Sequence, residues 1–352
     1  MNRDDGDEAQ IESAEVPFGA ALEGPLIEAC GGRLSKINWF RTAWQRGGAL
    51  TGYATFTDDA GRAHNVVVKL PVPPRERRWL VELQPKARPS LERSDESFGF
   101  ARTANGKGGF VPRLLAHGES VGGYDFAWVV MERLPFGPLD EKWAGREFDL
   151  IVHAAGRFYE ATADEPIDPS WSVRKRDWSA MLAEGRKRVQ ARGCAEPQRW
   201  KAALKRAAKK LDGWVELWDA RPAEGWCHGD LHLGNALTRF PHDTPINDAD
   251  TIDVVSGGAA LIDLAEVRVG HWVEDAVYLE HLFWSLPHRL HERKLVSMIA
   301  RERKARGLAV SEDWPELARV KRALLAMATA TKFHEVGRGH AAAALEVLER
   351  EV

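Results

Sequence analysis

The 352-residue chain changes its pattern once, near residue 133, and this change constrains the fold more than any other feature. Before it, aromatic and β-branched runs at 53–57, 65–70 and 126–131 alternate with glycine and aspartate clusters, which is typical of antiparallel strands. After it, apolar residues recur at helical spacing, first over 148–159. The pattern predicts an α+β protein with a small strand-rich part and a larger, mainly helical part.

This change of pattern suggests a division of the chain into three segments. Residues 1–30 are expected to form an acidic arm and lead-in, because Asp and Glu are dense at the start. Residues 31–133 are expected to form an N-terminal lobe and 134–352 a C-terminal lobe. The Pro- and Arg-rich stretch 71–90 is interpreted as an extension, and the polar stretch 240–258 as an inserted loop.

Composition excludes several classes of protein. The net charge of −3 does not demand a nucleic-acid partner, and no apolar run approaches the roughly 20 residues of a membrane span. Cys30, Cys194 and Cys227 are far apart and lack metal-binding spacing, which is typical of reduced thiols in a cytoplasmic protein. The charged start of the chain is unlike a signal peptide. No feature indicates an oligomeric state.

Residues 226–235, Trp-Cys-His-Gly-Asp-Leu-His-Leu-Gly-Asn, hold the most specific pattern in the chain. Four residues separate Asp230 from Asn235, as in the catalytic loop of protein kinases, where the aspartate meets the substrate hydroxyl and the asparagine holds magnesium. A second carboxylate should follow on a later strand, and Asp263 ends the apolar run 259–262. These side chains predict a phosphoryl-transfer site with magnesium.

Lys69 is a lone charge at the end of an apolar strand, and such a charge needs a partner. It could extend to solvent, as strand-end lysines do. The functional alternative is that it holds nucleotide phosphates and is steadied by a glutamate on a helix. Glu96 is favoured over Glu92 for this role, because Glu96 shares a helical face with Phe100.

Two further stretches are candidates for nucleotide contacts. Gly47 and Gly48 lie at an expected hairpin turn, where glycines allow backbone N–H groups to approach a phosphate, although such a pair is often only a turn. The strand 126–131 leads to a hinge between the lobes. There the carbonyl of Glu132 and the N–H of Leu134 are candidates to pair with a purine ring.

The motif at 228–235, followed by Leu-Ile-Asp at 261–263, resembles the aminoglycoside phosphotransferase and choline kinase family. Matches run in order over most of the chain and also include 67–69, 111–115 and 130–135. The resemblance implies a two-lobed protein-kinase-like fold. It also implies Mg²⁺-dependent transfer of the γ-phosphate of ATP to a hydroxyl group of a small molecule.

The resemblance also implies roles for individual residues. Asp230 would orient the acceptor hydroxyl and take or stabilise its proton, as the catalytic residue. Asn235 and Asp263 would bind Mg²⁺. Lys69, with Glu96, would hold the α- and β-phosphates. This set is chemically coherent, because phosphoryl transfer needs charge neutralisation and in-line positioning more than a strong base.

The resemblance also implies supporting roles for two residues, and the chain departs from the family pattern at three points. His228 and Asp275 would be structural, with Asp275 bonding the backbone of the catalytic loop. The gap between Asp230 and Asp263 is longer than expected, and 263–265 reads Asp-Leu-Ala. His271 stands where the family often has an acidic residue. None of these departures removes a residue that the mechanism needs.

Two other functions compete with a kinase. The chain could be a kinase-like nucleotide-binding module with weak catalysis. Gly-Asp-Leu-His at 229–232 also resembles a motif of two-metal phosphoesterases, but the Asp-x-His that those enzymes need earlier is absent before residue 228. The acceptor, and the choice of ATP or GTP, are not indicated. Trp143, Trp171, Trp178 and Trp284 are either core residues or the wall of a pocket for a cation or sugar ring.

Overall fold

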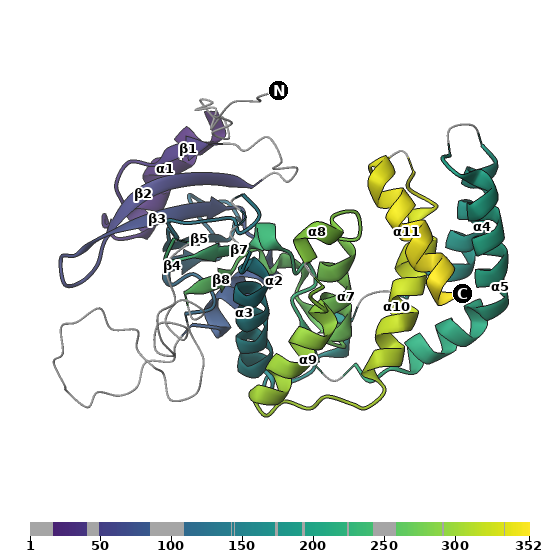
Figure 1. Ribbon diagram of the computed structural model, residues 1–352. Helices are drawn as coiled ribbons and strands as arrows, with labels where there is room; N and C mark the ends of the chain where they lie inside the picture. The colour runs from purple at the N-terminus through teal and green to yellow at the C-terminus, as the bar shows by residue number, and fades with distance from the viewer. Residues whose placement is uncertain are drawn as a thin grey trace, which may run out of the picture.

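The computed structural model describes most of the chain. The described residues are 17–40, 49–84, 109–141, 143, 145–172, 175–191, 194–223, 225–241, 258–290, 292–333 and 335–352. They form an α+β structure in which a five-stranded antiparallel sheet lies at one end and helices fill the rest (Figure 1). The fold class is therefore the one that the change of pattern predicts.

The sheet is built from the strand-rich part of the chain. Its strands stand in the order β1 (Asn38–Phe40), β2 (Leu50–Thr57), β3 (Ala63–Leu70), β5 (Trp128–Glu132) and β4 (Leu114–Gly118). Alternate residues of β3, among them Val66 and Val68, are fully buried in a core that also contains Leu22 and Leu26 of α1 (Pro17–Ala29). Because side chains alternate across a strand, Lys69 points to the opposite face.

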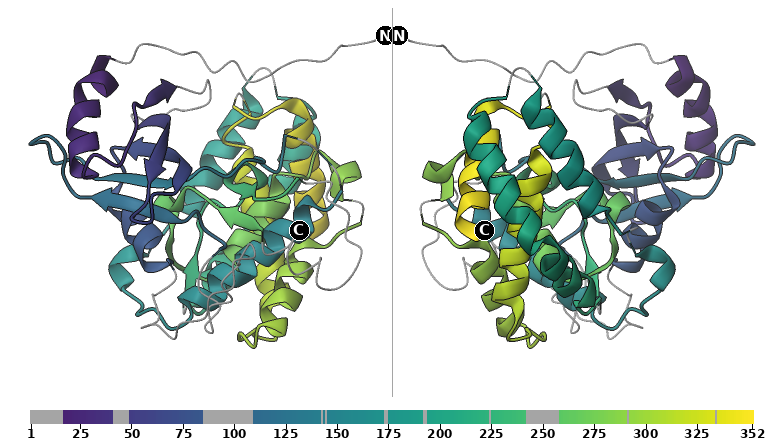
Figure 2. Two further views of the ribbon diagram at one scale, coloured as in Figure 1. Left: turned by 90° about the vertical axis from the view of Figure 1, so that its left-hand side faces the viewer. Right: turned by 90° about the vertical axis from the view of Figure 1, so that its right-hand side faces the viewer.

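Helix α1 lies in the segment 1–30, which was expected to be an acidic arm and lead-in. The helix lies against the sheet on the side away from the C-terminal helices (Figures 1 and 2). Residues 1–16 lie outside the described residues, and the rest of the three-part division remains a prediction.

The C-terminal part contains helices in two groups. Helices α3 (Glu147–Thr162), α7 (Val273–His281), α8 (Pro287–Leu290) and α9 (Leu295–Ala305) lie nearer the sheet. Helices α4 (Trp178–Gln190), α5 (Pro197–Ala220), α10 (Trp314–Thr329) and α11 (Arg338–Glu351) form a bundle at the far end (Figure 1). Within the described part of the chain, none of the helices combines the length and apolar character that crossing a membrane requires.

Helix α2 (Pro74–Glu82) lies in the stretch that was interpreted as an extension. Its Trp79 and Leu80 belong to the large core of the C-terminal part, not to the core beneath the sheet. The Trp79 ring lies 4.7 Å from that of Trp226 and 6.5 Å from that of Phe158. Burying such side chains contributes roughly 1.5–3 kcal/mol each. The helix that follows β3 is thus anchored to the larger core.

Short strands and turns hold the central loops. Strand β6 (Gly225–Cys227) pairs with β9 (Arg268–Gly270), and β7 (Ala236–Thr238) pairs with β8 (Ala259–Leu261). Single turns of 3₁₀ helix lie at η1 (Pro169–Trp171), η2 (Leu233–Asn235) and η3 (Leu264–Glu266). The expected strands at 236–238 and before Asp263 are therefore confirmed, and 242–257 of the inserted loop lie outside the described residues.

Candidate active site

Asp230 lies in the loop between β6 and η2, and Gly229 sets its position. Gly229 has a φ of +88°, and a Cβ atom there would lie 2.0 Å from the carbonyl oxygen of Glu266. Only glycine allows both this conformation and this close approach. The Asp230 side chain, which is 30% exposed, is thereby presented at the surface of the loop.

Three side chains surround the Asp230 carboxylate. Tyr278 donates its hydroxyl to Oδ1 at 2.6 Å, and Asn235 donates Nδ2 to Oδ2 at 3.1 Å. The Nε2 atom of His232 lies 3.4 Å from Oδ2. The hydrogen bond with His232, then that from Tyr278, holds the pKa of Asp230 well below its usual range, although burial opposes them. Asp230 is therefore a charged group suited to orienting a hydroxyl.

Sequence reasoning gave Tyr278 no role and considered His232 only as part of the phosphoesterase-like motif. His232 lies inside the recognised motif, so its position was visible. Tyr278 is 48 residues from Asp230, and no local pattern connects them. A weak signal is its place on α7, three positions after Asp275 and so on the same side of the helix.

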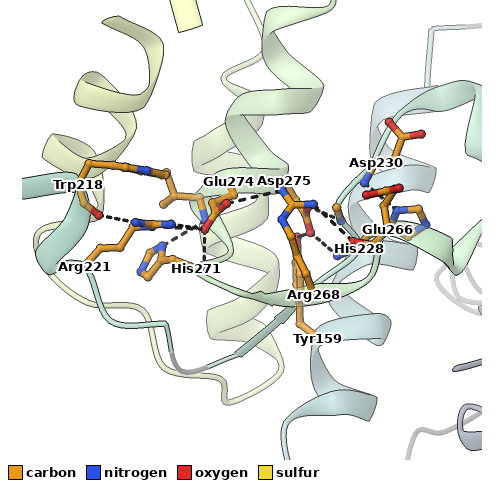
Figure 3. Close-up of polar contacts among 12 residues, drawn as sticks. Tyr159, Trp218, Arg221, His228, Asp230, Glu266, Arg268, His271, Glu274 and Asp275 are labelled. Atoms are coloured by element: carbon orange, nitrogen blue, oxygen red, sulfur yellow. Dashed lines mark hydrogen bonds and ion pairs between the residues drawn. The ribbon is translucent and has the colours of Figure 1, made fainter. Parts of the chain in front are cut away.

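Asp275 supports the loop from beneath. Its carboxylate is fully buried and accepts hydrogen bonds from the backbone N–H groups of His228, at 2.7 Å, and Gly229, at 2.9 Å (Figure 3). Tyr159 donates its hydroxyl to the same carboxylate at 3.0 Å. A buried carboxylate with three donors is well satisfied. The structural role expected for Asp275 is confirmed.

His228 connects the loop to the end of β8. Its Nε2 donates to the carbonyl of Ile262 at 3.1 Å, and its Nδ1 accepts from the N–H of Asp230 at 3.3 Å. Burial lowers the pKa of His228, which favours the neutral ring. Both ring nitrogens are occupied, so His228 holds the loop and is not placed to act as a base, as expected.

The start of α7 explains the histidine that departs from the family pattern. His271 accepts a hydrogen bond at Nδ1 from the N–H of Val273 at 3.3 Å, so its ring serves an N–H group of the first helical turn. Burial lowers the pKa of His271 to about 4, which keeps the ring neutral. A neutral imidazole can therefore accept this bond without a carboxylate at this position.

A buried glutamate anchors the same end of α7. Glu274 lies 2.9 Å from Arg221 and 3.6 Å from Arg268, and Figure 3 shows this line of polar groups running from Trp218 toward the catalytic loop. Burial raises the pKa of Glu274, but Lys321 and the two arginines more than offset it, so the net pKa is lowered. The helix that carries Asp275 is thus fixed by charges behind the loop.

The two expected magnesium ligands lie side by side because of the β7–β8 pairing. Ala236 pairs with Leu261, and the N–H of Ile262 donates to the carbonyl of Asn235 at 2.9 Å. Asp263 follows at once, in a left-handed conformation with φ +58° and a side chain that is 47% exposed. Because Nδ2 of Asn235 faces Asp230, its amide oxygen is the atom left to act as a ligand.

Lys69 is held by Glu76, a residue that the sequence analysis did not consider for this role. The Lys69 ammonium lies 2.7 and 2.9 Å from the two carboxylate oxygens of Glu76 and 3.9 Å from Oδ1 of Asp263. Burial raises the pKa of Glu76, and the Lys69 charge opposes that effect. Glu96 and its alternative Glu92 lie outside the described residues.

The start of α2 offered a signal for Glu76. Pro73 and Pro74 precede a glutamate in the first turn, and proline at a helix start followed by an acidic residue is typical of a helix N-terminus. This turn brings Glu76 back to the end of β3, where Lys69 stands. Sequence reasoning looked for the glutamate only in 91–103, where Glu96 shares a helical face with Phe100, and did not consider Glu76.

The remaining nucleotide candidates are partly described. Gly47 and Gly48 lie outside the described residues. Glu132 ends β5, where its side chain accepts from the N–H of Arg113 at 2.8 Å and contacts the guanidinium of Arg239. Leu134 follows and is buried. Binding of a purine by the backbone of Glu132 and Leu134 remains a prediction.

Comparison with solved structures found proteins of similar fold. A solved aminoglycoside phosphotransferase from Alicyclobacillus acidocaldarius is similar, with a TM-score of 0.50, 16% identity and 85% of each chain covered. A microcompartment-associated aminopropanol kinase is also similar, with a TM-score of 0.48, 16% identity and coverage of 87% of this chain and 88% of that one. No curated protein sequence matches the chain at a significant level.

A family model described as the phosphotransferase enzyme family matches residues 55–320, which span the sheet from β2 onward and the helices up to α10. The expected family and the expected kinase-like fold are both confirmed. Because this match covers most of the sequence, the chain belongs to the phosphotransferase enzyme family.

Proposed function

We propose that the protein transfers the γ-phosphate of Mg²⁺–ATP to a hydroxyl group of a small molecule. One observation carries the proposal: side chains from three separate elements converge. Lys69 of β3 lies 3.9 Å from Asp263 after β8, and Asn235 of the catalytic loop bonds Asp230 at 3.1 Å. This combination is the one that phosphoryl transfer from a nucleotide needs.

Lys69 and Glu76 form the phosphate-holding pair in this proposal. Lysine binds phosphate as a compact point charge, and the two contacts with Glu76 fix the direction of its ammonium group. Glu76 is almost fully buried, whereas the Lys69 side chain keeps some exposure, so Lys69 is the more accessible member of the pair. Its ammonium group also lies 3.9 Å from Asp263, one of the two candidate metal ligands.

Asn235 and Asp263 are the residues that would hold magnesium. An amide oxygen and an exposed carboxylate are hard oxygen ligands, and Mg²⁺ typically takes one or two carboxylates and completes its shell with water and substrate phosphates. The donor set therefore fits the ion. When bound, it would supply charge neutralisation on the phosphates.

Asp230 would accept a hydrogen bond from the acceptor hydroxyl and aim its oxygen along the line of transfer. A carboxylate with a low pKa is a weak base, but a metaphosphate-like transition state asks little of the base until the new bond forms. Oδ1 of Asp230 accepts the bond from Tyr278 and retains a further lone pair for the acceptor.

Replacing Asp230 with Asn should lower kcat by about 10²–10⁴-fold, because the neutral amide cannot accept the proton or stabilise it. The affinity for ATP should remain close to wild type. Coupled ADP release and calorimetric titration of ATP measure the two quantities. Asp149→Asn, an exposed charge paired with Arg293, is the matched control. Wild-type turnover in Asp230→Asn would show that Asp230 is misassigned.

Replacing Asp263 with Ala should remove the dependence of ATP binding on Mg²⁺, because the carboxylate ligand is lost. Calorimetry with and without Mg²⁺ measures this dependence. Glu266→Ala, an exposed acid three residues away, should keep it. An unchanged Mg²⁺ dependence in Asp263→Ala argues against its role as a ligand.

Replacing Glu76 with Ala should weaken ATP binding by about tenfold, because a charge-assisted bond of roughly 1.5–3 kcal/mol no longer orients Lys69. Glu96→Ala should bind ATP as the wild type does. Titration of ATP into both variants measures the difference. The opposite result, with Glu96→Ala impaired and Glu76→Ala normal, returns the role to Glu96.

Replacing Tyr278 with Phe should move the acid limb of the kcat/KM profile to higher pH. The Tyr278 hydroxyl stabilises the charged form of Asp230, so its loss raises the pKa of Asp230 and the active ionised form disappears sooner as pH falls. A hydrogen bond to a charged group predicts a movement of about one pH unit. Tyr124→Phe, on an exposed ring, is the control. An acid limb that stays in place refutes this coupling.

A further inference from the structure

The two oxygens of Asp230 face different surroundings. Asn235, a candidate metal ligand, and His232 lie at Oδ2. Among the described residues, Tyr278 of α7 is the side chain that bonds Oδ1. The Oδ2 side is therefore the nucleotide side in the proposed function, and the Oδ1 side is where an acceptor hydroxyl would approach.

Three aromatic side chains continue from Tyr278. The carbonyl of Tyr278 accepts from Nδ1 of His281 at 2.6 Å, and the two rings lie 5.1 Å apart. The His281 ring lies 5.6 Å from Trp284 and 5.7 Å from His340, and the last two rings stack at 6.1 Å. We call Tyr278, His281, Trp284 and His340 the aromatic wall.

The aromatic wall is accessible and joins two parts of the fold. All four side chains are partly exposed. Tyr278 and His281 belong to α7, and Trp284 follows that helix, whereas His340 comes from the first turns of α11 in the distant bundle. The wall therefore begins at the catalytic carboxylate and bridges the two groups of helices.

The aromatic wall carries no charge near neutral pH. Burial lowers the pKa of His281 to about 4 and also lowers the pKa of His340. The adjacent carboxylate of Glu280 accepts two bonds from Arg322, at 2.6 and 2.8 Å, and lies 3.5 Å from the Trp284 N–H. Its charge is thus compensated by a guanidinium and is not open to a ligand ammonium group.

We propose that the aromatic wall binds an uncharged ring of the acceptor, a sugar or an aryl group, and presents a hydroxyl of that ring to Oδ1 of Asp230. This inference rests on the proposed function. Apolar ring faces gain from contact with aromatic side chains. A polycation would lose water beside the Arg322–Glu280 pair without gaining a free carboxylate from Glu280.

A cation could instead bind over an aromatic face. The compensated Glu280 removes the carboxylate nearest to Trp284 that could assist an ammonium group. The uncharged ring is therefore the better match, and the cation becomes an outcome of the test.

The test compares matched acceptors by coupled ADP release. Methyl glucoside is paired with glucosamine, and benzyl alcohol with choline; kanamycin serves as a polycation. The uncharged member of a pair should show a kcat/KM about tenfold higher or more, and Trp284→Ala and His340→Ala should raise its KM by about tenfold. Their affinity for ATP should stay at the wild-type value. His288→Ala, an exposed histidine on α8, is the control and should match the wild type.

Three results would overturn the aromatic wall: preference for the charged members, an unchanged KM in both wall variants, or binding of Mg²⁺–ATP with no stimulation by either uncharged probe. Failure of the proposed function looks different. The wild-type protein would then fail to bind Mg²⁺–ATP, or Asp230→Asn would turn over as fast as the wild type.

Discussion

The ion pair between Lys69 and Glu76 joins the two hydrophobic cores of this protein. Lys69 stands on β3, whose other face packs on α1, whereas Glu76 stands on α2, whose Trp79 is buried in the larger core. Removing one partner of a buried pair leaves an uncompensated charge and costs about 3–5 kcal/mol, although the intact pair adds little net stability. The pair therefore acts chiefly to fix the position of the sheet relative to the helical part. The 3.9 Å distance between Lys69 and Asp263 depends on that relative position.

Helix α2 extends this constraint to both halves of the active site. Trp79 contacts Trp226 of β6, the strand that leads into the catalytic loop, and α2 also packs against η3, the turn that follows Asp263. One short helix thus touches the strand before Asp230 and the turn after Asp263, and carries the glutamate that orients Lys69. Rigid packing of this kind transmits small displacements, because protein interiors are close-packed.

The parts of the site that the sequence predicted are those fixed by local geometry. Asp230 and Asn235 lie in one short loop of a recognised motif, and the apolar run before Asp263 forms the strand whose pairing with β7 brings Asp263 beside Asn235. Glu76 was missed because the partner of Lys69 depends on which helix packs into the larger core. Tertiary packing decides this, and the helical periodicity in 91–103 gives no information about it. Tyr278 was missed for the same reason, since its contact with Asp230 exists only after α7 docks beneath the loop.

Helix α7 connects the residues that position Asp230 with the aromatic wall, where the acceptor is proposed to bind. Asp275, Tyr278 and His281 recur every three residues, about 4.5 Å along the helix axis, and therefore share one side. The first supports the loop backbone, the second bonds the catalytic carboxylate, and the third begins the part of the aromatic wall beyond it. In the proposed function, the chemistry of the transfer restrains the first two positions. The third position has ring contacts with Trp284 and His340, and among the described residues no hydrogen bond, ion pair or ring contact joins these three side chains to Lys69 or to the two candidate magnesium ligands. A change of acceptor could thus be accommodated there without a change in the proposed geometry at Asp230.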